Sequence, residues 1–397
     1  MTALRKLIFI LNFSFLFFYS SAQTDSLQAC DIQISLLTCS PGEELYSTFG
    51  HTAIRVKDAR NGSDIVFNYG TFEFSPEFYA QFIQGKLLYY LSVEDYSNFI
   101  LQYNYEKRSI VEQVLRISCD AKQNVLDALL LNAQEPNRYY RYDFLFDNCT
   151  TRAGDIIAKN AGAPVFFKNI LPKETPTFRN LLHHYLDRGG QNWSKLGIDI
   201  LLGMKVDKKV TNRQAMFLPD YLLKGFDSAT INGQKLVTPP QTILHIPSPS
   251  NRGSLFRPSF VFFILLIVAS LLIFNTYRNK QRTLHIFDTI FFLITGLAGL
   301  VILFMWFGTD HYVCRYNLNI FWALPTNVAA AFVVNRNKDW VKGYFKIVFW
   351  ISILLLAAWF FLPQQMNDAL IPVVIILIIR SWYLSKKQNN AGERNIA

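Results

Sequence analysis

Apolar residues are distributed unevenly along the 397-residue chain, and the pattern changes abruptly after residue 257. Beyond that point, long apolar runs alternate with short polar segments, and the first two runs are each long enough to cross a bilayer. The third run is shorter and is interrupted by Pro325. The pattern predicts an all-α transmembrane domain over 258–384 with five spans, at 258–277, 284–307, 319–334, 343–362 and 369–384.

Residues 23–236 carry shorter patterns, which switch between period two and helical spacing. An Asn-Gly pair at 61–62 lies between two strand-like runs and is a strong hairpin signal. We predict an α+β outer domain in which a small antiparallel sheet packs against helices. Its predicted strands cover "DIQISLLTC", 51–56, 65–72 and residues near 109–117, and its predicted helices cover 75–86, 120–134 and a segment that begins at Cys149.

The two ends of this outer domain differ in composition from the domain itself. Residues 1–22 combine Arg5 and Lys6 with an apolar core and a small-residue site, which is typical of a secretory signal peptide. A retained membrane anchor is the alternative interpretation. Residues 237–257 are rich in Pro and Ser and are predicted to link the outer domain to the membrane.

The loops between the apolar runs predict the orientation of the membrane half. Segments 277–282, 335–343 and 380–390 are basic, whereas 308–319 and 363–368 are not clearly so. Basic loops stay in the cytoplasm, so the outer domain is expected outside it and the tail 385–397 inside. The net charge of +10 is partly explained by these cytoplasmic segments. The sequence contains no basic repeat interleaved with aromatic residues, so nothing in it indicates nucleic-acid binding.

Five cysteines do not give a closed disulfide framework. Cys30 and Cys39 could pair in an oxidising compartment, and Cys119 could have a structural role. Cys314 lies in an outer loop of the membrane half. We interpret Cys149 as a free thiol, with a bridge between Cys119 and Cys149 as the alternative.

The surroundings of Cys149 favour chemistry. This residue follows a strand-like apolar run, 144–146, and is predicted to open a helix within "DNCTTR". A helix N-terminus offers unpaired N–H groups and positive charge, which lower the pKa of a cysteine and favour the reactive thiolate. Asn148 adds an amide that could stabilise an oxyanion. Thr150 and Arg152 add polar groups that are expected to contact the substrate.

His51 is the histidine best placed to serve as the base. It begins a predicted strand, and a strand histidine facing a cysteine at a helix start is the arrangement used for acyl transfer. If the Asn-Gly turn closes the hairpin, Asn68 lies on the same face as His51 and could orient its imidazole. Tyr69 and Glu43 are weaker candidates for that role, and Tyr69 is also expected to contact the substrate.

Structural interpretations stand beside these assignments. A strand histidine is often only hydrogen-bonded, and a cysteine at a helix start can be a packed small residue. His183 and His184 are interpreted as a solvated helix face. Asp310, His311 and Arg315 in the outer loop could hold a phosphate headgroup or line an acyl entrance. The grouping of Asp310, His311 and Cys314 provides too few ligands for zinc, so we predict no metal. Covalent Cys/His chemistry needs no cofactor, and we predict none.

Four stretches of this sequence resemble the DUF4105 family of Bacteroidetes-type membrane proteins: "GEELYSTFGHTAIRV", "FNYGTFEF", "YDFLFDNCTTR" and "WFGTDHYVCRYNLNIFWALP". The family's histidine and cysteine correspond to His51 and Cys149. The order of these two residues is that of circularly permuted papain-like NlpC/P60 thiol enzymes, a fold-level analogy only. Members of the family include lipoprotein N-acyltransferases, so the resemblance implies a multi-pass protein of the bacterial inner membrane whose catalytic domain faces the periplasm.

The implied reaction moves an acyl chain from a phospholipid, through a Cys149 thioester, to the α-amine of a diacylglyceryl-cysteine lipoprotein. The same Cys/His chemistry could instead hydrolyse amides, as in a membrane-anchored cysteine peptidase or amidase that acts on envelope peptides. A hydrolase would hardly need five spans, which favours a lipid substrate. A third possibility is a non-enzymatic envelope protein in which Cys149 is structural.

Overall fold

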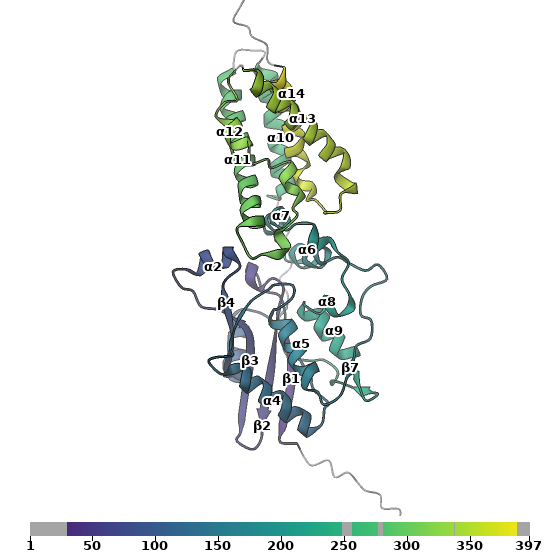
Figure 1. The fold of residues 1–397 in the computed structure, drawn as a ribbon. Helices are drawn as coiled ribbons and strands as arrows, with labels where there is room; N and C mark the ends of the chain where they lie inside the picture. The colour runs from purple at the N-terminus through teal and green to yellow at the C-terminus, as the bar shows by residue number, and fades with distance from the viewer. Residues whose placement is uncertain (1–29, 248–255, 277–280, 337, 387–397) are drawn as a thin grey trace, which may run out of the picture.

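The computed structural model describes residues 30–247, 256–276, 281–336 and 338–386. The molecule is elongated, with a mixed sheet-and-helix domain at one end and a helical bundle at the other (Figure 1). This arrangement confirms the predicted fold class, an α+β domain followed by an all-α region. The predicted signal peptide and all but the first two residues of the predicted tail lie outside the described residues.

A seven-stranded antiparallel sheet forms the framework of the first domain within the described residues. The hairpin at Asn61-Gly62 closes as predicted, since Gly62 has a φ of 72° and Ile54 pairs with Phe67. Continuing this register places Asn68 across from Ala53, on the face that also carries His51. In spatial order the strands are β10 (Gln241–Leu244), β5 (Ile110–Val114), β1 (Ile32–Cys39), β2 (His51–Asp58), β3 (Ser63–Thr71), β4 (Leu88–Asp95) and β6 (Tyr139–Arg141).

Helices cover both faces of this sheet. On one face, α4 (Cys119–Ala133) and α5 (Cys149–Asn160) bury Val125 and Ile157 against Leu36 and Phe67 (Figure 1). On the other face, α3 (Tyr96–Tyr105) contributes Phe99 to a second core. The helix predicted at 75–86 is shorter, because α2 (Phe78–Gln84) begins after a turn and ends at Gly85. The predicted helix at 120–134 is confirmed as α4.

Residues 163–236 form a helical extension beside the sheet (Figure 1). The prediction of a linker over 237–257 is wrong for its first part, because residues 241–244 form β10 and complete the sheet edge against β5. The other elements are β7 (Val165–Phe166), β8 (Thr230–Ile231), β9 (Gln234–Lys235), α6 (Phe178–Arg188), α7 (Asn192–Leu201), α8 (Asn212–Ala215) and α9 (Pro219–Ser228).

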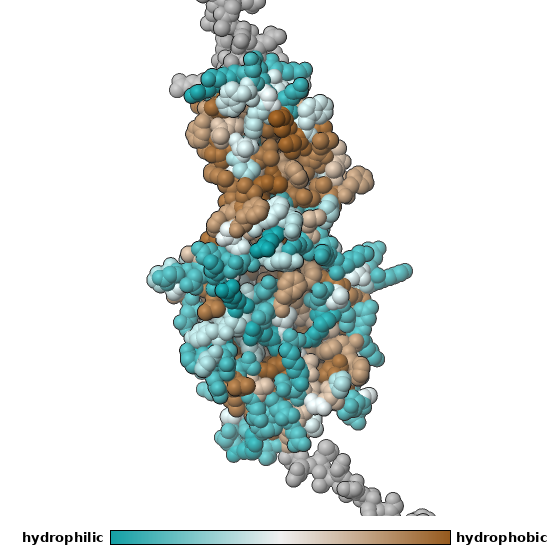
Figure 2. All heavy atoms as spheres, viewed as in Figure 1, coloured by the Kyte–Doolittle hydropathy of each residue, from teal (hydrophilic) through white to brown (hydrophobic). Residues whose placement is uncertain are grey.

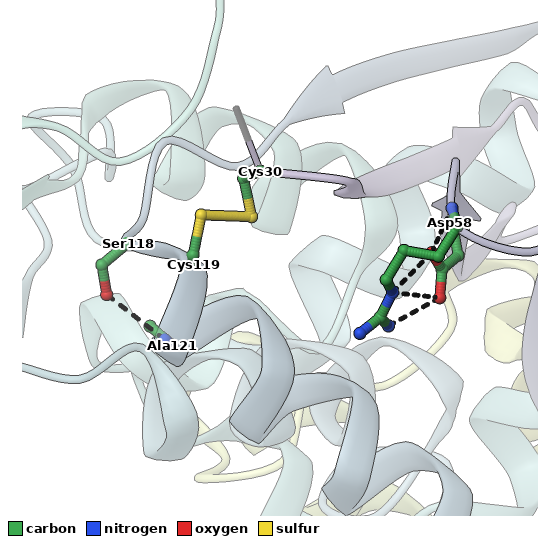
Figure 3. Close-up of a disulfide and its surroundings, with 6 residues drawn as sticks. Cys30, Asp58, Ser118, Cys119 and Ala121 are labelled. Atoms are coloured by element: carbon green, nitrogen blue, oxygen red, sulfur yellow. Dashed lines mark hydrogen bonds and ion pairs between the residues drawn. A yellow bond between two sulfur atoms is a disulfide. The ribbon is translucent and has the colours of Figure 1, made fainter. Parts of the chain in front are cut away.

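A disulfide joins Cys30 to Cys119 (Figure 3). Cys39 and Cys149 are free, so the possible pairing of Cys30 with Cys39 and the alternative bridge between Cys119 and Cys149 do not form. Cys30 and Cys39 stand at opposite ends of β1, roughly 30 Å apart along an extended strand. The bridge ties the start of the sheet to the start of α4. Cys149 is a free cysteine, as predicted.

The second domain carries a hydrophobic belt with a hydrophilic end (Figure 2). Among the described residues, three segments form helices long and apolar enough to cross a membrane: Thr283–Phe307, Asp339–Phe361 and Asp368–Ser385. Pro258–Phe274 forms a shorter apolar helix. The helices are α10 (Pro258–Thr276), α11 (Gln281–Phe307), α12 (Asn327–Ala331), α13 (Asp339–Ala358) and α14 (Ile371–Ser385).

The predicted third span, 319–334, is not one continuous helix. A 3-10 helix, Leu318–Phe321, is followed by turns at Pro325 and by the short α12. This broken segment packs on glycines of α11: a Cβ at Gly299 would overlap the carbonyl of Ala323, and one at Gly296 would overlap Val328. Close backbone contact with α11 therefore replaces the regular helix that apolarity alone predicted.

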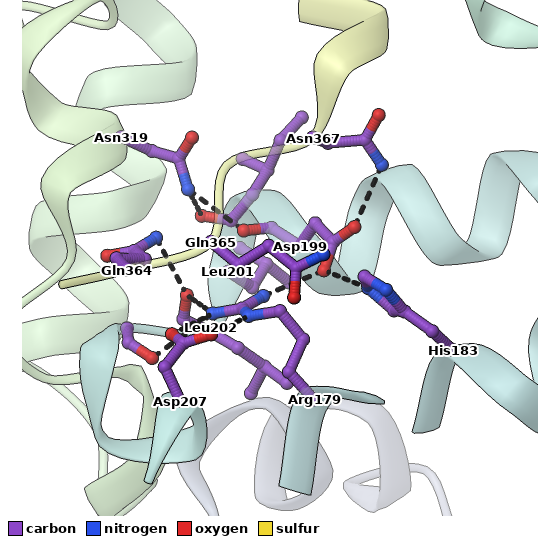
Figure 4. A network of polar contacts seen from close by, with 12 residues as sticks. Arg179, His183, Asp199, Leu201, Leu202, Asp207, Asn319, Gln364, Gln365 and Asn367 are labelled. Carbon is purple, nitrogen blue, oxygen red and sulfur yellow. Dashed lines mark hydrogen bonds and ion pairs between the residues drawn. The ribbon is translucent and has the colours of Figure 1, made fainter. Parts of the chain in front are cut away.

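A buried polar network joins the two domains (Figure 4). Arg179 of α6 donates to Asp207 at 2.8 Å and to Asp199 of α7 at 2.7 Å. Asp199 also accepts from His183 and from Asn367 of the helical domain, both at 2.8 Å. His183 is therefore not part of a solvated helix face, since its imidazole lies against a carboxylate that the sequence places 16 residues away.

Candidate active site

Cys149 is the first residue of α5, and its neighbour Asn148 caps that helix. The Asn148 Oδ1 accepts hydrogen bonds from the N–H groups of Thr150 and Thr151, both at 2.9 Å. The Asn148 side chain does not bond to the N–H of Cys149. This N–H lies at the positive end of the helix, beside the thiol of the same residue. The predicted strand-like run at 144–146 is instead a turn, closed by paired backbone bonds between Asp143 and Asp147.

The prediction that Asn148 stabilises an oxyanion is wrong. Its side-chain Nδ2 donates to the carbonyl oxygens of Phe144, at 2.8 Å, and Phe217, at 2.9 Å. Both amide hydrogens are therefore used, and the side chain is 3% exposed. Asn148 fixes the start of α5 in the core and so positions Cys149, but it has no hydrogen left for a substrate oxygen.

His51 lies directly beside Cys149, as predicted. It begins β2 after Gly50, whose φ of 80° allows the chain to pass the carbonyl of Cys39. The His51 Nε2 lies 3.0 Å from Asn68 Oδ1, and because an amide oxygen only accepts, Nε2 is the donor of this bond. The imidazole and the Cys149 thiol interact, since each shifts the pKa of the other toward its charged form.

A fourth residue, Glu94 of β4, extends this chain of contacts. The Asn68 Nδ2 donates to Glu94 Oε1 at 2.5 Å. Burial raises the pKa of Glu94, while the hydrogen bond from Asn68 and the charge of His51 lower it. Asn68, not Tyr69, bonds to the imidazole, while the Tyr69 ring packs against Tyr140 in the core that also contains Cys149. No local sequence pattern points to Glu94, because its place in the site depends on the pairing of β3 with β4.

The electrostatics favour a thiolate–imidazolium pair. Burial raises the pKa of the Cys149 thiol, but the charge and hydrogen bond of His51, the N–H of Thr52 and the Thr150 hydroxyl lower it to about 7. Burial lowers the pKa of His51, but the Cys149 charge and the hydrogen bond to Asn68 raise it above its ordinary value. Both directions follow from mutual stabilisation of the charged forms. The thiol is therefore close to ionisation at neutral pH.

Thr150 was predicted to contact the substrate, but its side chain is buried in the core. It is 1% exposed, and its Oγ1 lies 3.2 Å from Thr52 Oγ1 and 3.7 Å from the sulfur of Cys149. This hydroxyl supports the thiolate from within the core. Arg152 is ion-paired with Asp147 at 2.6 Å, and its guanidinium lies 3.5 Å from the centre of the Tyr140 ring.

Tyrosine side chains form the wall around the thiol. Tyr140 is 7% exposed, and its hydroxyl has no hydrogen-bond partner among the described residues. A Cβ on Gly70 would lie 3.4 Å from Cys149 Cβ and 3.9 Å from the Tyr140 hydroxyl, which places that hydroxyl close to the reactive residue. Tyr142 lies at the same point, 3.5 Å from the Gly70 Cβ position. An unpartnered buried hydroxyl beside a thiolate is available to a substrate oxygen.

Comparisons with known proteins assign both halves of the chain. Residues 18–183 match the family model of the Lnb N-terminal periplasmic domain, and residues 250–390 match that of the Lnb transmembrane domain. The chain is a membrane protein with a periplasmic domain. No curated protein and no solved structure matches it. The periplasmic match contains Cys149, His51, Asn68, Glu94 and Tyr140.

The predicted outer-loop residues join the transmembrane domain to the periplasmic domain. Asp310 lies 3.5 Å from Arg141 of β6, and the His311 Nε2 lies 3.0 Å from the carbonyl oxygen of Phe82 in α2. Arg315 is exposed and lies near the ring of Tyr312. The contacts of Asp310 and His311 are thus with the rim of the periplasmic domain. No group of three His, Cys, Asp or Glu side chains suited to a metal ion occurs among the described residues.

Proposed function

We propose that this protein is a lipoprotein N-acyltransferase of the bacterial inner membrane, with its Cys/His site in the periplasm. The observation that carries the proposal is the buried Cys149–His51 pair, whose thiol pKa is lowered to about 7 in a domain joined to transmembrane helices. A thiolate at neutral pH is suited to attack on an acyl ester. The transmembrane domain keeps this nucleophile at the surface where phospholipids and lipoproteins meet.

In the first half-reaction, the Cys149 thiolate attacks the ester carbonyl carbon of a phospholipid. The carbonyl oxygen becomes an oxyanion, for which the N–H of Cys149 and the free hydroxyl of Tyr140 are the available donors. Collapse of the tetrahedral intermediate breaks the ester C–O bond. The departing alkoxide of the lysophospholipid takes the proton from the His51 imidazolium, which leaves a Cys149 thioester and a neutral imidazole.

In the second half-reaction, the α-amine of a diacylglyceryl-cysteine attacks the thioester. His51, held by Asn68, accepts the proton of the amine, and the C–S bond breaks as the amide forms. The thiolate–imidazolium pair is thereby restored. The cycle requires no oxidant, reductant or further reactant, because the acyl group passes from one ester to one amine.

The test is to trap the acyl-enzyme. The purified protein in nanodiscs that contain phosphatidylethanolamine should gain the mass of one fatty acyl chain, and a Cys149→Ser variant should not gain a thioester. Cys314→Ala is the matched control, since it removes a buried thiol whose pKa burial raises to about 12. A synthetic diacylglyceryl-cysteine peptide should then discharge the thioester and gain the same mass.

The alternative activity, cleavage of envelope peptides by a cysteine peptidase or amidase, gives a different result in this experiment. A peptidase would show no acyl adduct from phospholipid and would cleave a peptide amide in a Cys149-dependent way. Absence of the acyl adduct together with peptide cleavage would overturn the transferase proposal.

A further inference from the structure

The segment around α2 exposes an unusual set of apolar side chains for a periplasmic domain. The exposed fractions are 74% for Phe74, 68% for Tyr79, 50% for Phe82 and 47% for Ile83. Aromatic and aliphatic side chains gathered on a short surface segment are typical of a contact with protein or membrane. The position of α2 relative to the transmembrane helices decides between these two partners.

The α2 segment is fastened to the outer end of a membrane-spanning helix. The backbone N–H of Asp310 donates to the carbonyl of Gln84 at 2.9 Å, and the ring of His311 bonds to the carbonyl of Phe82 at 3.0 Å. Gly85, with a φ of 71°, packs against Asp310 and His311. These residues closely follow Phe307, the 76% exposed end of α11. Figure 1 shows α2 beside the end of α11 where the helical bundle meets the first domain.

Aromatic rings lead from α2 to the thiol without a break. The ring centres of Phe82 and Phe78 lie 6.1 Å apart, and those of Phe78 and Phe72 lie 5.4 Å apart. Phe72 is 5.4 Å from Tyr89, which stacks on Tyr142 at 4.3 Å. Tyr142 reaches the Gly70 position, where a Cβ would lie within 3.5 Å of both Tyr142 and Cys149. Because Gly70 has no side chain, the space that its Cβ would occupy is left free between Tyr142 and Cys149.

We propose that α2 inserts its apolar side chains into the outer surface of the bilayer, and that the rings from Phe82 to Tyr142 guide one acyl chain of a membrane phospholipid to Cys149. The contact with the bilayer is continuous with the lipid-facing surface of α11. The guiding role rests on the proposed acyl-transfer function, whereas the lipid contact does not. The bilayer supplies the substrate, and the aromatic track accepts the chain that transfer requires.

Photo-cross-linking tests the lipid contact without turnover. The full-length Cys149→Ser protein would be placed in phosphatidylethanolamine vesicles doped with a phospholipid that carries a diazirine at the end of one acyl chain. After irradiation and proteolysis, labelled peptides should include residues 72–89 as well as the transmembrane helices. Label confined to the transmembrane helices would overturn the proposal.

A substitution series tests the guiding role. Phe82→Ser with Ile83→Ser should slow acylation of Cys149 by a long-chain phospholipid about tenfold. Acylation by a water-soluble acetyl thioester should be unchanged. Leu131→Ser, which replaces a 56% exposed side chain on α4, is the matched control and should affect neither donor.

The two donors separate the possible outcomes. Equal slowing with both donors, or no slowing with either, would overturn the aromatic track. Failure of both donors to acylate the unaltered protein would instead overturn the proposed function, while the cross-linking result would still show whether α2 contacts lipid.

Discussion

Two buried polar clusters in this protein use similar residues and differ in how completely their groups are paired. At the domain junction, Arg179 donates to both Asp199 and Asp207 and to the carbonyls of Leu202 and Gly203 (Figure 4). His183 and Asn367 occupy the remaining positions around Asp199. At the thiol, by contrast, the Tyr140 hydroxyl has no partner among the described residues.

The fully paired cluster at the junction is suited to supporting the fold, whereas the cluster at Cys149 is suited to chemistry. A buried network in which each charge is paired resists change, because removing any member leaves another charge without a partner. A cluster with a nucleophile near its pKa and a spare donor can instead bind a developing charge. We therefore expect variants at the two clusters to affect different properties.

The largest effect is expected for the base. His51→Gln should slow acylation of Cys149 by about 10⁴-fold, because the thiol loses both its proton acceptor and the charge that lowers its pKa. Intact-mass kinetics of the acyl-enzyme would measure this rate. His183→Gln is the matched control, since that imidazole also bonds to a neighbouring side chain but lies at the junction. Similar losses in both variants would contradict the separation of the two clusters.

The next largest effect is expected at the junction. Arg179→Leu leaves Asp199 and Asp207 buried without their shared partner and should lower the free energy of unfolding by about 3–5 kcal/mol. Lys195→Leu, which breaks a half-exposed pair with Asp187 nearby, should cost less than about 1 kcal/mol. Thermal unfolding in detergent, monitored by protease susceptibility, would compare the stabilities of the two variants. A loss from Arg179→Leu no larger than that from Lys195→Leu would contradict the junction's supporting role.

The sequence predicted that His51 and Cys149 lie together better than it predicted their surroundings, for a physical reason. His51 and Cys149 each carry a local signal: a strand start after glycine, and a polar helix start. Asn68 followed from the hairpin, because an Asn-Gly turn fixes the register of its two strands. Glu94 requires the pairing of β3 with β4, which are joined through a loop and α2, and no local pattern sets that register.

Contacts between distant segments account for the errors. The pairing of Cys30 with Cys119 depends on where α4 packs, and spacing along the chain carries no information about that. His183 looks like a surface residue in its own helix and is covered only because α7 folds back over α6. Asn148 was assigned as a donor because a cap and an oxyanion site use the same residue type.

A smaller and more specific effect is expected for the unpaired hydroxyl of Tyr140. Tyr140→Phe should slow acylation by about 10²-fold, because it removes one donor to the oxyanion. It should leave the unfolding temperature unchanged or slightly higher, since an unpaired buried polar group is lost. Tyr185→Phe should do the opposite: it breaks a 2.9 Å bond to Asp220 and should cost about 1 kcal/mol without slowing acylation. Stopped-time mass spectrometry and thermal unfolding of both variants would test this contrast, and an unslowed Tyr140→Phe would contradict it.

The smallest effect is expected for the residue that orients the base, and pH reveals it. Acylation should increase as pH rises through about 7, where the Cys149 thiol ionises. The hydrogen bond from His51 to Asn68 raises the pKa of His51, so Asn68→Ala should lower that pKa and weaken the support of the thiolate. The Cys149 pKa should consequently rise, and the ascending limb of the pH–rate profile should move to higher pH. The rate should fall about tenfold at pH 7 and recover toward that of the unaltered protein at pH 9. Glu94→Gln keeps an oxygen acceptor for Asn68 and should move the limb in the same direction by less. A uniform loss at all pH values would mean that Asn68 acts on the position of His51 and not on its charge.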